Sequence, residues 1–255
     1  MTPWPVYVIN MAANTTRMAR ASAVLERLGI PFTRFEAVDG RALSQAELAR
    51  VYDPVANARR ARHPMIGPEL GCYLSHIALW ERIASGAAAG GVILEDDFTA
   101  DGDLAAVLAA LETDAGAWEL AKLFSLHARQ GVVARQPLVP GREIVVPYKV
   151  PTTTLGYAIR REAAARLAGI ALPVSRPIDE DHKHFWEIGL RVALVMPPPL
   201  SFGEQEAETG TIQGARRRAR GLRGAAALRQ GWRTLRYRLA YLAALHWHRL
   251  VRRAR

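Results

Sequence analysis

The chain has 255 residues and a formal net charge of +10, and half of its residues are hydrophobic, so it can bury the core of one large α/β domain or two small ones. Its positive charge is concentrated at one end. Residues 214–255 contain 13 Arg and no acidic residue, which leaves 21 of the 34 basic residues against 24 acidic ones in residues 1–213. The single cysteine, Cys72, excludes an internal disulfide and favours a reducing compartment, and we expect it to be an inert buried thiol.

The N-terminal third begins with a strand, a helix and a second strand. Residues 6–9 (VYVI) predict a buried strand, and residues 14–28 predict a helix that ends at Gly29. Residues 32–38 predict the next strand. Two strands joined by a helix form a right-handed βαβ unit with parallel strands.

The next segment alternates polar and apolar stretches. A capping-box pattern at residues 44–47 predicts a short helix, and the polar, basic residues 53–63 predict a surface loop. Residues 67–84 carry a broad apolar stripe and predict a long helix. Gly86 ends that helix and leads to the strand at residues 92–94.

The remaining elements follow from the same patterns. We predict a helix at 104–111, a strand at 120–126, a hairpin within 129–150, a strand at 156–159, a helix at 161–167 and a last strand at 190–195. Strands that alternate with helices predict an α/β fold with a mostly parallel central sheet flanked by helices.

Two acidic clusters adjoin apolar segments. Glu95-Asp96-Asp97 directly follows the strand residues Val92-Ile93-Leu94, and Asp179-Glu180-Asp181 follows Ile178. The carboxyl edge of an open α/β sheet is where ligands bind. If both clusters lie at this edge, one can hold a divalent metal while the other supplies a general base. The plainer alternatives are a solvated acidic turn for the first cluster and a charged helix start for the second.

Other chemistries find little support in the sequence. It has no zinc-type cysteine pattern, no Walker loop, no Gly-x-Gly-x-x-Gly and nothing that suggests a Ser-His-Asp hydrolase. His182 and His184 are two positions apart and therefore do not share a helical face, so we do not expect them to bind one ion together. His76 is read either as a core or surface histidine or as a substrate contact.

Several stretches together match one family pattern. They are residues 28–32 (LGIPF), 35–40 (FEAVDG), 67–83 (GPELGCYLSHIALWERI), 92–97 (VILEDD), 156–159 (GYAI) and 179–192. In these stretches and in their order the chain resembles glycosyltransferase family 25, which includes lipooligosaccharide and collagen galactosyltransferases. The resemblance covers roughly residues 5–205.

The resemblance implies a GT-A-like domain at residues 1–213, a UDP-sugar donor, typically UDP-galactose, and inversion at the anomeric carbon. It also implies Mn²⁺ or Mg²⁺, with Asp97 and Glu95 as the metal ligands and Asp181 as the catalytic base beside Glu180. The donor-binding candidates are Asn10, Arg17, Asp39, Ser75, His76, Glu95, Asp96 and Lys122. The acceptor-side candidates are Thr153, Gly156, Tyr157, Asp179, His182 and Trp186. Residues 10–14 depart from the family, because they lack the charged residues usual after its first strand.

The basic tail, residues 214–255, predicts an amphipathic helix. Its apolar stripe consists of Leu228, Trp232, Leu235, Leu239 and Leu242. Arg229, Arg233 and Arg236 follow the same spacing, and Tyr237, Tyr241 and Trp247 add amphipathic rings. This pattern is typical of helices that bind an anionic membrane surface. Packing on the body or on a partner, and nucleic-acid binding through residues 216–218, remain alternatives, of which nucleic acid ranks last.

These features lead to one expected function and two alternatives. We expect a transferase that moves a sugar, galactose first, to a glycan or a lipid-linked acceptor such as lipopolysaccharide. The N-terminus shows no signal peptide and no run is long enough to span a membrane, so we expect a cytoplasmic protein peripheral to the inner face of the cytoplasmic membrane. The alternatives are a metal-dependent nucleotidyl or phosphoryl transferase and a non-catalytic transferase fold that tethers partners to the membrane.

Overall fold

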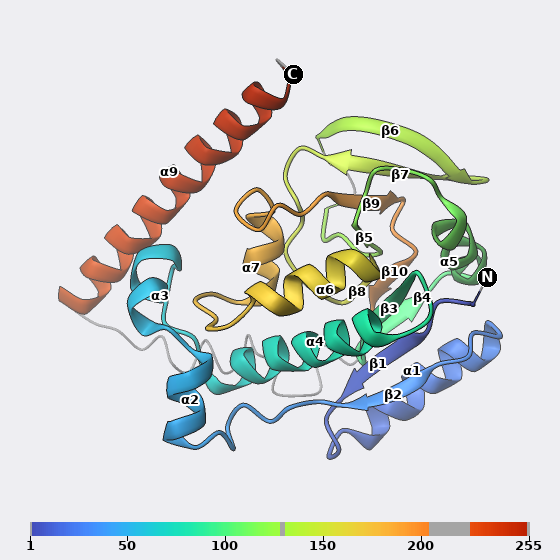
Figure 1. Ribbon diagram of the computed structural model, residues 1–255, viewed down its shortest axis with the longest axis horizontal. Helices are drawn as coiled ribbons and strands as arrows, with labels where there is room; N and C mark the ends of the chain where they lie inside the picture. The colour runs from blue at the N-terminus through green and yellow to red at the C-terminus, as the bar shows by residue number, and fades with distance from the viewer. Residues whose placement is uncertain (1, 128–130, 204–224, 254–255) are drawn as a thin grey trace.

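The computed structural model describes residues 2–127, 131–203 and 225–253, which form an α/β fold with a central sheet and helices on both faces (Figure 1). The strands of the large sheet are β1 (Val6–Asn10), β2 (Thr33–Glu36), β3 (Gly90–Glu95), β5 (Leu120–Lys122), β6 (Val132–Val139), β7 (Arg142–Pro147), β8 (Gly156–Arg160) and β9 (Val192–Met196). Two short strands, β4 (Phe98–Ala100) and β10 (Leu200–Phe202), pair separately.

The large sheet is mixed, which corrects the prediction of a mostly parallel sheet. Among the described residues its strand order is β2-β1-β3-β8-β5-β9-β7-β6. Parallel pairing joins β1 to β2, as the βαβ pattern predicts, and also joins β1 to β3 and β5 to β9. The other neighbours are antiparallel. The predicted hairpin is confirmed as β6 and β7, whose tight turn places Gly141 at φ +81. A short turn of this kind joins only antiparallel strands, since a parallel connection needs a crossover of a dozen or more residues.

Helices cover the sheet. They are α1 (Thr15–Arg27), α2 (Gln45–Val51), α3 (Pro54–Arg60), α4 (Gly67–Ser85), α5 (Leu104–Thr113), α6 (Arg161–Ile170), α7 (Ile178–Lys183) and α9 (Ala225–Arg253). In Figure 1, α4 and α6 lie across the front of the sheet and α1 lies at its lower right.

Helix α3 lies where the sequence predicts a surface loop. The Asp53 carboxylate accepts hydrogen bonds from the backbone N–H groups of Val55 and Ala56, and Pro54 occupies the first turn. Asn57 is buried, and its amide donates to the Ser175 carbonyl at 2.8 Å. The segment is thus a surface helix whose arginines Arg59 and Arg60 are exposed, while one polar residue, Asn57, contacts a distant part of the chain.

Two hydrophobic cores lie on opposite faces of the sheet. Alternate strand residues point to each side: Val8 and Leu94 pack with α1 and α5, while Tyr7 and Ile93 belong to the core that includes residues of α4, α6 and α9. The acid cluster after β3 is thereby held at the carboxyl end of a strand that is buried on both faces.

The C-terminal helix α9 packs on the body through one side. Tyr237, Tyr241 and Leu245 are buried, and the last two belong to the same core as α4 and α6. This side of the helix therefore packs on the body, which is one of the alternatives that the sequence leaves open for the tail. No helix in the described parts of the chain is both long and apolar enough to cross a bilayer. The predicted domain boundary at 213/214 and the arginines at 216–218 lie outside the described residues.

Candidate functional site

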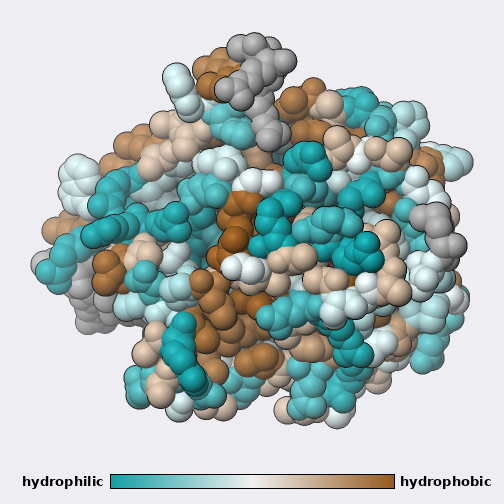
Figure 2. Space-filling model, in the orientation of Figure 1, coloured by the Kyte–Doolittle hydropathy of each residue, from teal (hydrophilic) through white to brown (hydrophobic). Residues whose placement is uncertain are grey.

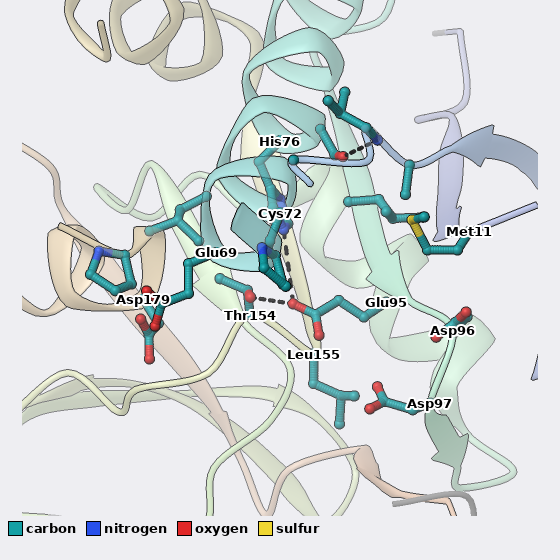
Figure 3. Close-up of a pocket in the computed structure, with 18 of the residues that line it drawn as sticks. Met11, Glu69, Cys72, His76, Glu95, Asp96, Asp97, Thr154, Leu155 and Asp179 are labelled. Carbon is teal, nitrogen blue, oxygen red and sulfur yellow. Dashed lines mark hydrogen bonds and ion pairs between the residues drawn. The ribbon is translucent and has the colours of Figure 1, made fainter. Parts of the chain in front are cut away.

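A cavity of about 310 Å³ opens where the carboxyl ends of β1 and β3 meet the first turns of α4. Its wall includes the residues before β8 and the start of α7. This is the edge of the sheet at which the sequence predicts both acidic clusters. In Figure 3, Asp96 and Asp97 lie on one side of the cavity, and Asp179 lies with Glu69 on the other.

Three glycines let the loop after β2 approach helix α4. A Cβ on Gly71 would lie 2.2 Å from the carbonyl oxygen of Val38, and one on Gly40 would lie 1.9 Å from that of Gly67. The Ser75 hydroxyl accepts a hydrogen bond from the Val38 N–H at 2.9 Å. These close contacts hold the loop that carries Asp39 against the cavity, so Ser75 acts through the loop as well as lining the wall.

The first acidic cluster is held by a network that starts on α1. Arg17 forms an ion pair with Asp96 at 3.0 Å and donates a hydrogen bond to Asp97 at 2.8 Å. Asn10 is fully buried behind the cavity wall, and its amide donates to Asp96 at 2.7 Å. Arg17, Asp96 and Asp97 line the cavity, whereas Asn10 positions Asp96 from behind.

The charges of this cluster are unbalanced. Burial and the neighbouring Glu95 raise the pKa of Asp97 to about 7, although Arg17 acts in the opposite direction. Burial also raises the pKa of Asp96, despite Arg17 and Asn10. The Oδ1 atom of Asp97 is buried and has no hydrogen-bond partner among the described residues. Three carboxylates face one guanidinium, so a cation beside them would be stabilised.

Glu95 belongs to a second group of possible metal ligands. One atom each of Cys72, His76 and Glu95 lie within 4.8 Å of one another, so these side chains can hold a metal ion. Cys72 and His76 are four positions apart on α4 and therefore share a helical face. Burial by itself would raise the pKa of Glu95, but His76 and the Thr154 hydroxyl lower it.

A hydrogen-bond network orients the His76 ring. Its Nδ1 lies 2.8 Å from the Tyr157 hydroxyl, and that hydroxyl accepts a hydrogen bond from Trp80 Nε1 at 2.9 Å. The Nε2 atom of His76 has no hydrogen-bond partner among the described residues and lies 3.9 Å from Glu95 Oε1. Tyr157 is completely buried in the core and does not line the cavity, so it acts on the site through His76.

The opposite wall is built by Thr153, Thr154 and Asp179. Thr153 has φ +87, a region that β-branched residues rarely adopt, and its Oγ1 is buried with no hydrogen-bond partner among the described residues. Backbone strain of this kind is concentrated at functional sites. The buried Lys122 stands behind this wall and donates to the Thr153 carbonyl. Burial lowers the pKa of Lys122 to about 8, although Asp179 and Glu95 act against this.

Asp181 does not line the cavity, although the sequence places the catalytic base there. Its carboxylate accepts a hydrogen bond from the Tyr73 hydroxyl at 2.6 Å and is paired with the buried Arg176. Glu180 is likewise engaged, by Arg62, Lys183 and the Tyr237 hydroxyl. Because α7 is a helix, its three acids point in different directions, and Asp179 is the one that faces the cavity.

Three further acceptor-side candidates belong to the core and not to the cavity wall. A Cβ on Gly156 would lie 2.3 Å from the Leu200 side chain, so Leu200 packs in the space beside this glycine. His182 is buried between the rings of Trp80 and Tyr157, and burial keeps its pKa well below the usual range. Trp186 packs on Tyr241 of α9.

Some residues that line the cavity were not among the site residues predicted from the sequence. The cavity is also lined by Met11, Arg41, Glu69, Thr154 and Phe202. Cys72 is half-buried on the cavity wall and not in the core, and burial raises the pKa of its thiol well above the usual range, which favours the less reactive thiol form. Its spacing of four from His76 is the signal that points to it.

Comparison with known proteins identifies the family. The model of glycosyltransferase family 25 (LPS biosynthesis protein) matches residues 4–181. The chain is 29% identical over 186 residues to a glycosyltransferase 25 family member of Anopheles gambiae, covering 69% of this chain and 30% of the relative. It is 28% identical over 184 residues to mouse procollagen galactosyltransferase 2, and the match covers 69% of this chain and 29% of the relative.

The human inactive glycosyltransferase 25 family member 3 is 27% identical over 186 residues, covering 69% of this chain and 30% of the relative. The chain thus spans about a third of the length of these relatives. The family model, in contrast, covers more than half of this chain and includes both walls of the cavity. The chain therefore belongs to glycosyltransferase family 25.

Proposed function

We propose that this protein is an inverting glycosyltransferase of GT-A type that moves a sugar, galactose first, from a UDP-sugar to a hydroxyl group of a glycan or glycolipid. One observation carries the proposal. A single cavity joins the carboxylates of Glu95, Asp96 and Asp97 on one wall with Asp179 on the other. Its volume of about 310 Å³ lies at the lower end of the usual range for small-molecule sites, roughly 300–1,000 Å³.

One wall of the cavity suits the acceptor hydroxyl, and the other suits the diphosphate of the donor. Asp179 removes the proton from the acceptor hydroxyl, and the resulting oxygen attacks the anomeric carbon from the face opposite the diphosphate. The new C–O bond forms as the bond from the anomeric carbon to the diphosphate oxygen breaks, so UDP leaves and the configuration inverts. The transition state is oxocarbenium-like, as in glycoside hydrolysis. We place the base on Asp179 and not on Asp181, because Asp181 is held by Tyr73 and Arg176 outside the cavity.

Arg17 and the acids around it fit the departing diphosphate and a divalent ion. The excess of carboxylates over guanidinium and the unpartnered Asp97 Oδ1 are features expected of a cation site. Asp97 and Glu95 would hold Mn²⁺ or Mg²⁺, which supplies charge stabilisation for the leaving UDP when bound. Cys72 and His76 offer an alternative set of ligands that shares Glu95.

A donor screen tests the proposal. UDP-galactose, UDP-glucose and their N-acetyl forms are each incubated with the full chain and candidate glycan acceptors, with and without Mn²⁺, and the release of UDP is measured. Calorimetry with UDP alone measures binding. UDP release that depends on an acceptor supports transfer, and release of a nucleoside monophosphate would instead indicate a nucleotidyl transferase. Absence of both UDP release and UDP binding would overturn the proposal.

A second candidate is a transferase fold that binds a nucleotide without transferring sugar. It is favoured by the ion pairs of Arg17, which engage both Asp96 and Asp97, and by the relative that is named inactive. Tight UDP binding with no turnover of any donor or acceptor is the result that would select it.

A further inference from the structure

The inner side of α9 is fixed to the body by polar contacts as well as by the buried tyrosines. Arg233 donates to the side chain of Asn57 at 2.8 Å and to the backbone carbonyl of Ala61 at 2.7 Å. The Tyr237 hydroxyl donates to Glu180 on α7. Arg249, near the other end of the helix, donates to the Pro147 carbonyl at 2.5 Å. The helix is thus attached along its length, and its orientation on the body is defined.

The outer side of α9 carries an exposed apolar stripe: Leu228, Trp232, Leu235, Leu239 and Leu242. Trp232 is 72% exposed and Leu239 is 60% exposed. Steps of four and three residues keep these side chains on one face, and at 100° per residue that face points away from Tyr237 and Tyr241. The stripe runs for about 20 Å along the helix at 1.5 Å per residue. Trp247 and Leu250 are also exposed beyond it.

Positive charge borders this outer stripe. Arg229 and Arg236 lie on one flank of it and Arg238 on the other, and all three are exposed. Residues 214–255 contain no acidic residue. Figure 2 shows brown apolar side chains interleaved with teal hydrophilic ones along the upper left edge of the molecule, where α9 lies.

The combination of stripe and charge selects one occupant. A second copy of the chain would bring two sets of arginines together with no acid of this helix between them, which is unfavourable. An anionic bilayer accepts both features at once, since the apolar side chains enter the boundary between headgroups and acyl chains while the arginines contact lipid phosphates. We propose that the outer stripe of α9 is a docking surface for an anionic lipid bilayer. Binding of this kind needs no donor or acceptor sugar, so it goes beyond the proposed transfer reaction.

Vesicle co-sedimentation of the full chain tests this surface. We expect the protein to sediment with vesicles of phosphatidylcholine and phosphatidylglycerol, to bind weakly to phosphatidylcholine alone and to be released by high salt. The double variant Trp232→Ser/Leu239→Ser should lower the partition coefficient at least about tenfold. The matched control is Leu126→Ser/Ile170→Ser, which removes similarly exposed apolar side chains from the body and should bind as the wild type does.

Three outcomes would overturn the proposal. They are no binding to anionic vesicles, equal binding by the stripe variant and the wild type, and a lipid-free dimer that the stripe variant disrupts without any vesicle binding. Sedimentation velocity in the absence of vesicles detects the dimer. Thermal unfolding of both variants shows whether they are folded, and UDP binding in solution reports separately on the proposed transferase.

Discussion

Arg17 Nη2 lies 2.8 Å from Asp97 Oδ2, so a guanidinium from the first helix engages one oxygen of the carboxylate that the family resemblance implies as a metal ligand. The other oxygen, Oδ1, has no hydrogen-bond partner among the described residues. The carboxylate can therefore keep its contact with Arg17 and still bind a cation. Because one guanidinium balances only part of the charge of three acids, the cluster should bind a divalent ion in a pH-dependent way.

Affinity for Mn²⁺ should rise with pH up to about 7. Burial raises the pKa of Asp97 to about 7, so below that pH the metal must displace a proton, and affinity should fall about tenfold per pH unit. Asp97→Asn should bind Mn²⁺ more weakly and lose this dependence. Electron paramagnetic resonance of free Mn²⁺ between pH 5 and 8 measures the affinity of each protein for Mn²⁺ and its dependence on pH. A wild-type affinity that stays constant over this range would contradict the prediction.

Cobalt spectroscopy distinguishes the two sets of ligands around Glu95. If Cys72, His76 and Glu95 hold the metal, Co²⁺ should give a thiolate-to-metal charge-transfer band in the near ultraviolet that Cys72→Ser abolishes. If Asp97 and Glu95 hold it, the wild type should bind Co²⁺ without this band, and Cys72→Ser should bind equally well. Removing metal with a chelator should reverse either spectrum.

Asp179 and Asp181 form a matched pair for the assignment of the base. Asp179→Asn should lower kcat about 100-fold or more, while UDP affinity and the melting temperature stay close to wild type. Asp181→Asn should instead destabilise the fold by about 3 kcal/mol, because it leaves the buried Arg176 without one of its partners. Chemical unfolding and donor kinetics on both variants separate the roles. If Asp181→Asn is as stable as the wild type but has no transfer activity, Asp181 and not Asp179 is the catalytic base.

Glu180 should contribute stability that is lost in acid. Burial alone would raise its pKa, but Lys183, Arg62 and the Tyr237 hydroxyl lower it to about 2, below the ordinary value of 4.5. A depressed carboxyl pKa stabilises the fold above pH 4.5, and the contribution disappears as pH falls from 4.5 towards 2. The free energy of unfolding of Glu180→Gln should therefore be about 3 kcal/mol lower than that of the wild type at pH 7. Urea unfolding between pH 7 and pH 3 should show that the stability difference between the wild type and Glu180→Gln becomes smaller as the pH falls. A stability difference that stays constant over this range would contradict the prediction.

Two glycine substitutions test the contact between α4 and the loop after β2. In Gly71→Ala the new Cβ would lie 2.2 Å from the Val38 carbonyl oxygen, so the loop must move, at a cost of about 1–3 kcal/mol. UDP affinity should fall as well, because this loop lines the cavity. Gly169→Ala in α6 meets nothing within 4 Å and should be neutral or more stable by up to about 1 kcal/mol. Thermal melting and UDP calorimetry on both variants make the comparison.

Patterns local in the chain were determined by the sequence. The βαβ start, the capped helix at residue 44, the long helix at 67–84 and the acidic cluster after a buried strand follow from periodicity and turn chemistry. The family assignment also follows from short motifs, and the family model confirms it. The parallel pairing of β1 and β2 could be inferred because one chain segment contains both strands of the unit and the helix between them.

Contacts between distant segments were decided only by the tertiary structure. Whether β8 runs parallel or antiparallel to β3, whether Asn57 is buried and which acid of α7 faces the cavity depend on partners far away in the chain. The tail shows the same limit. Its sequence predicts a helix with apolar and basic residues, but only packing shows that the side with Tyr237 and Tyr241 faces the body while the leucine stripe stays exposed. A periodic pattern defines a face of a helix, and the rest of the fold determines what that face meets.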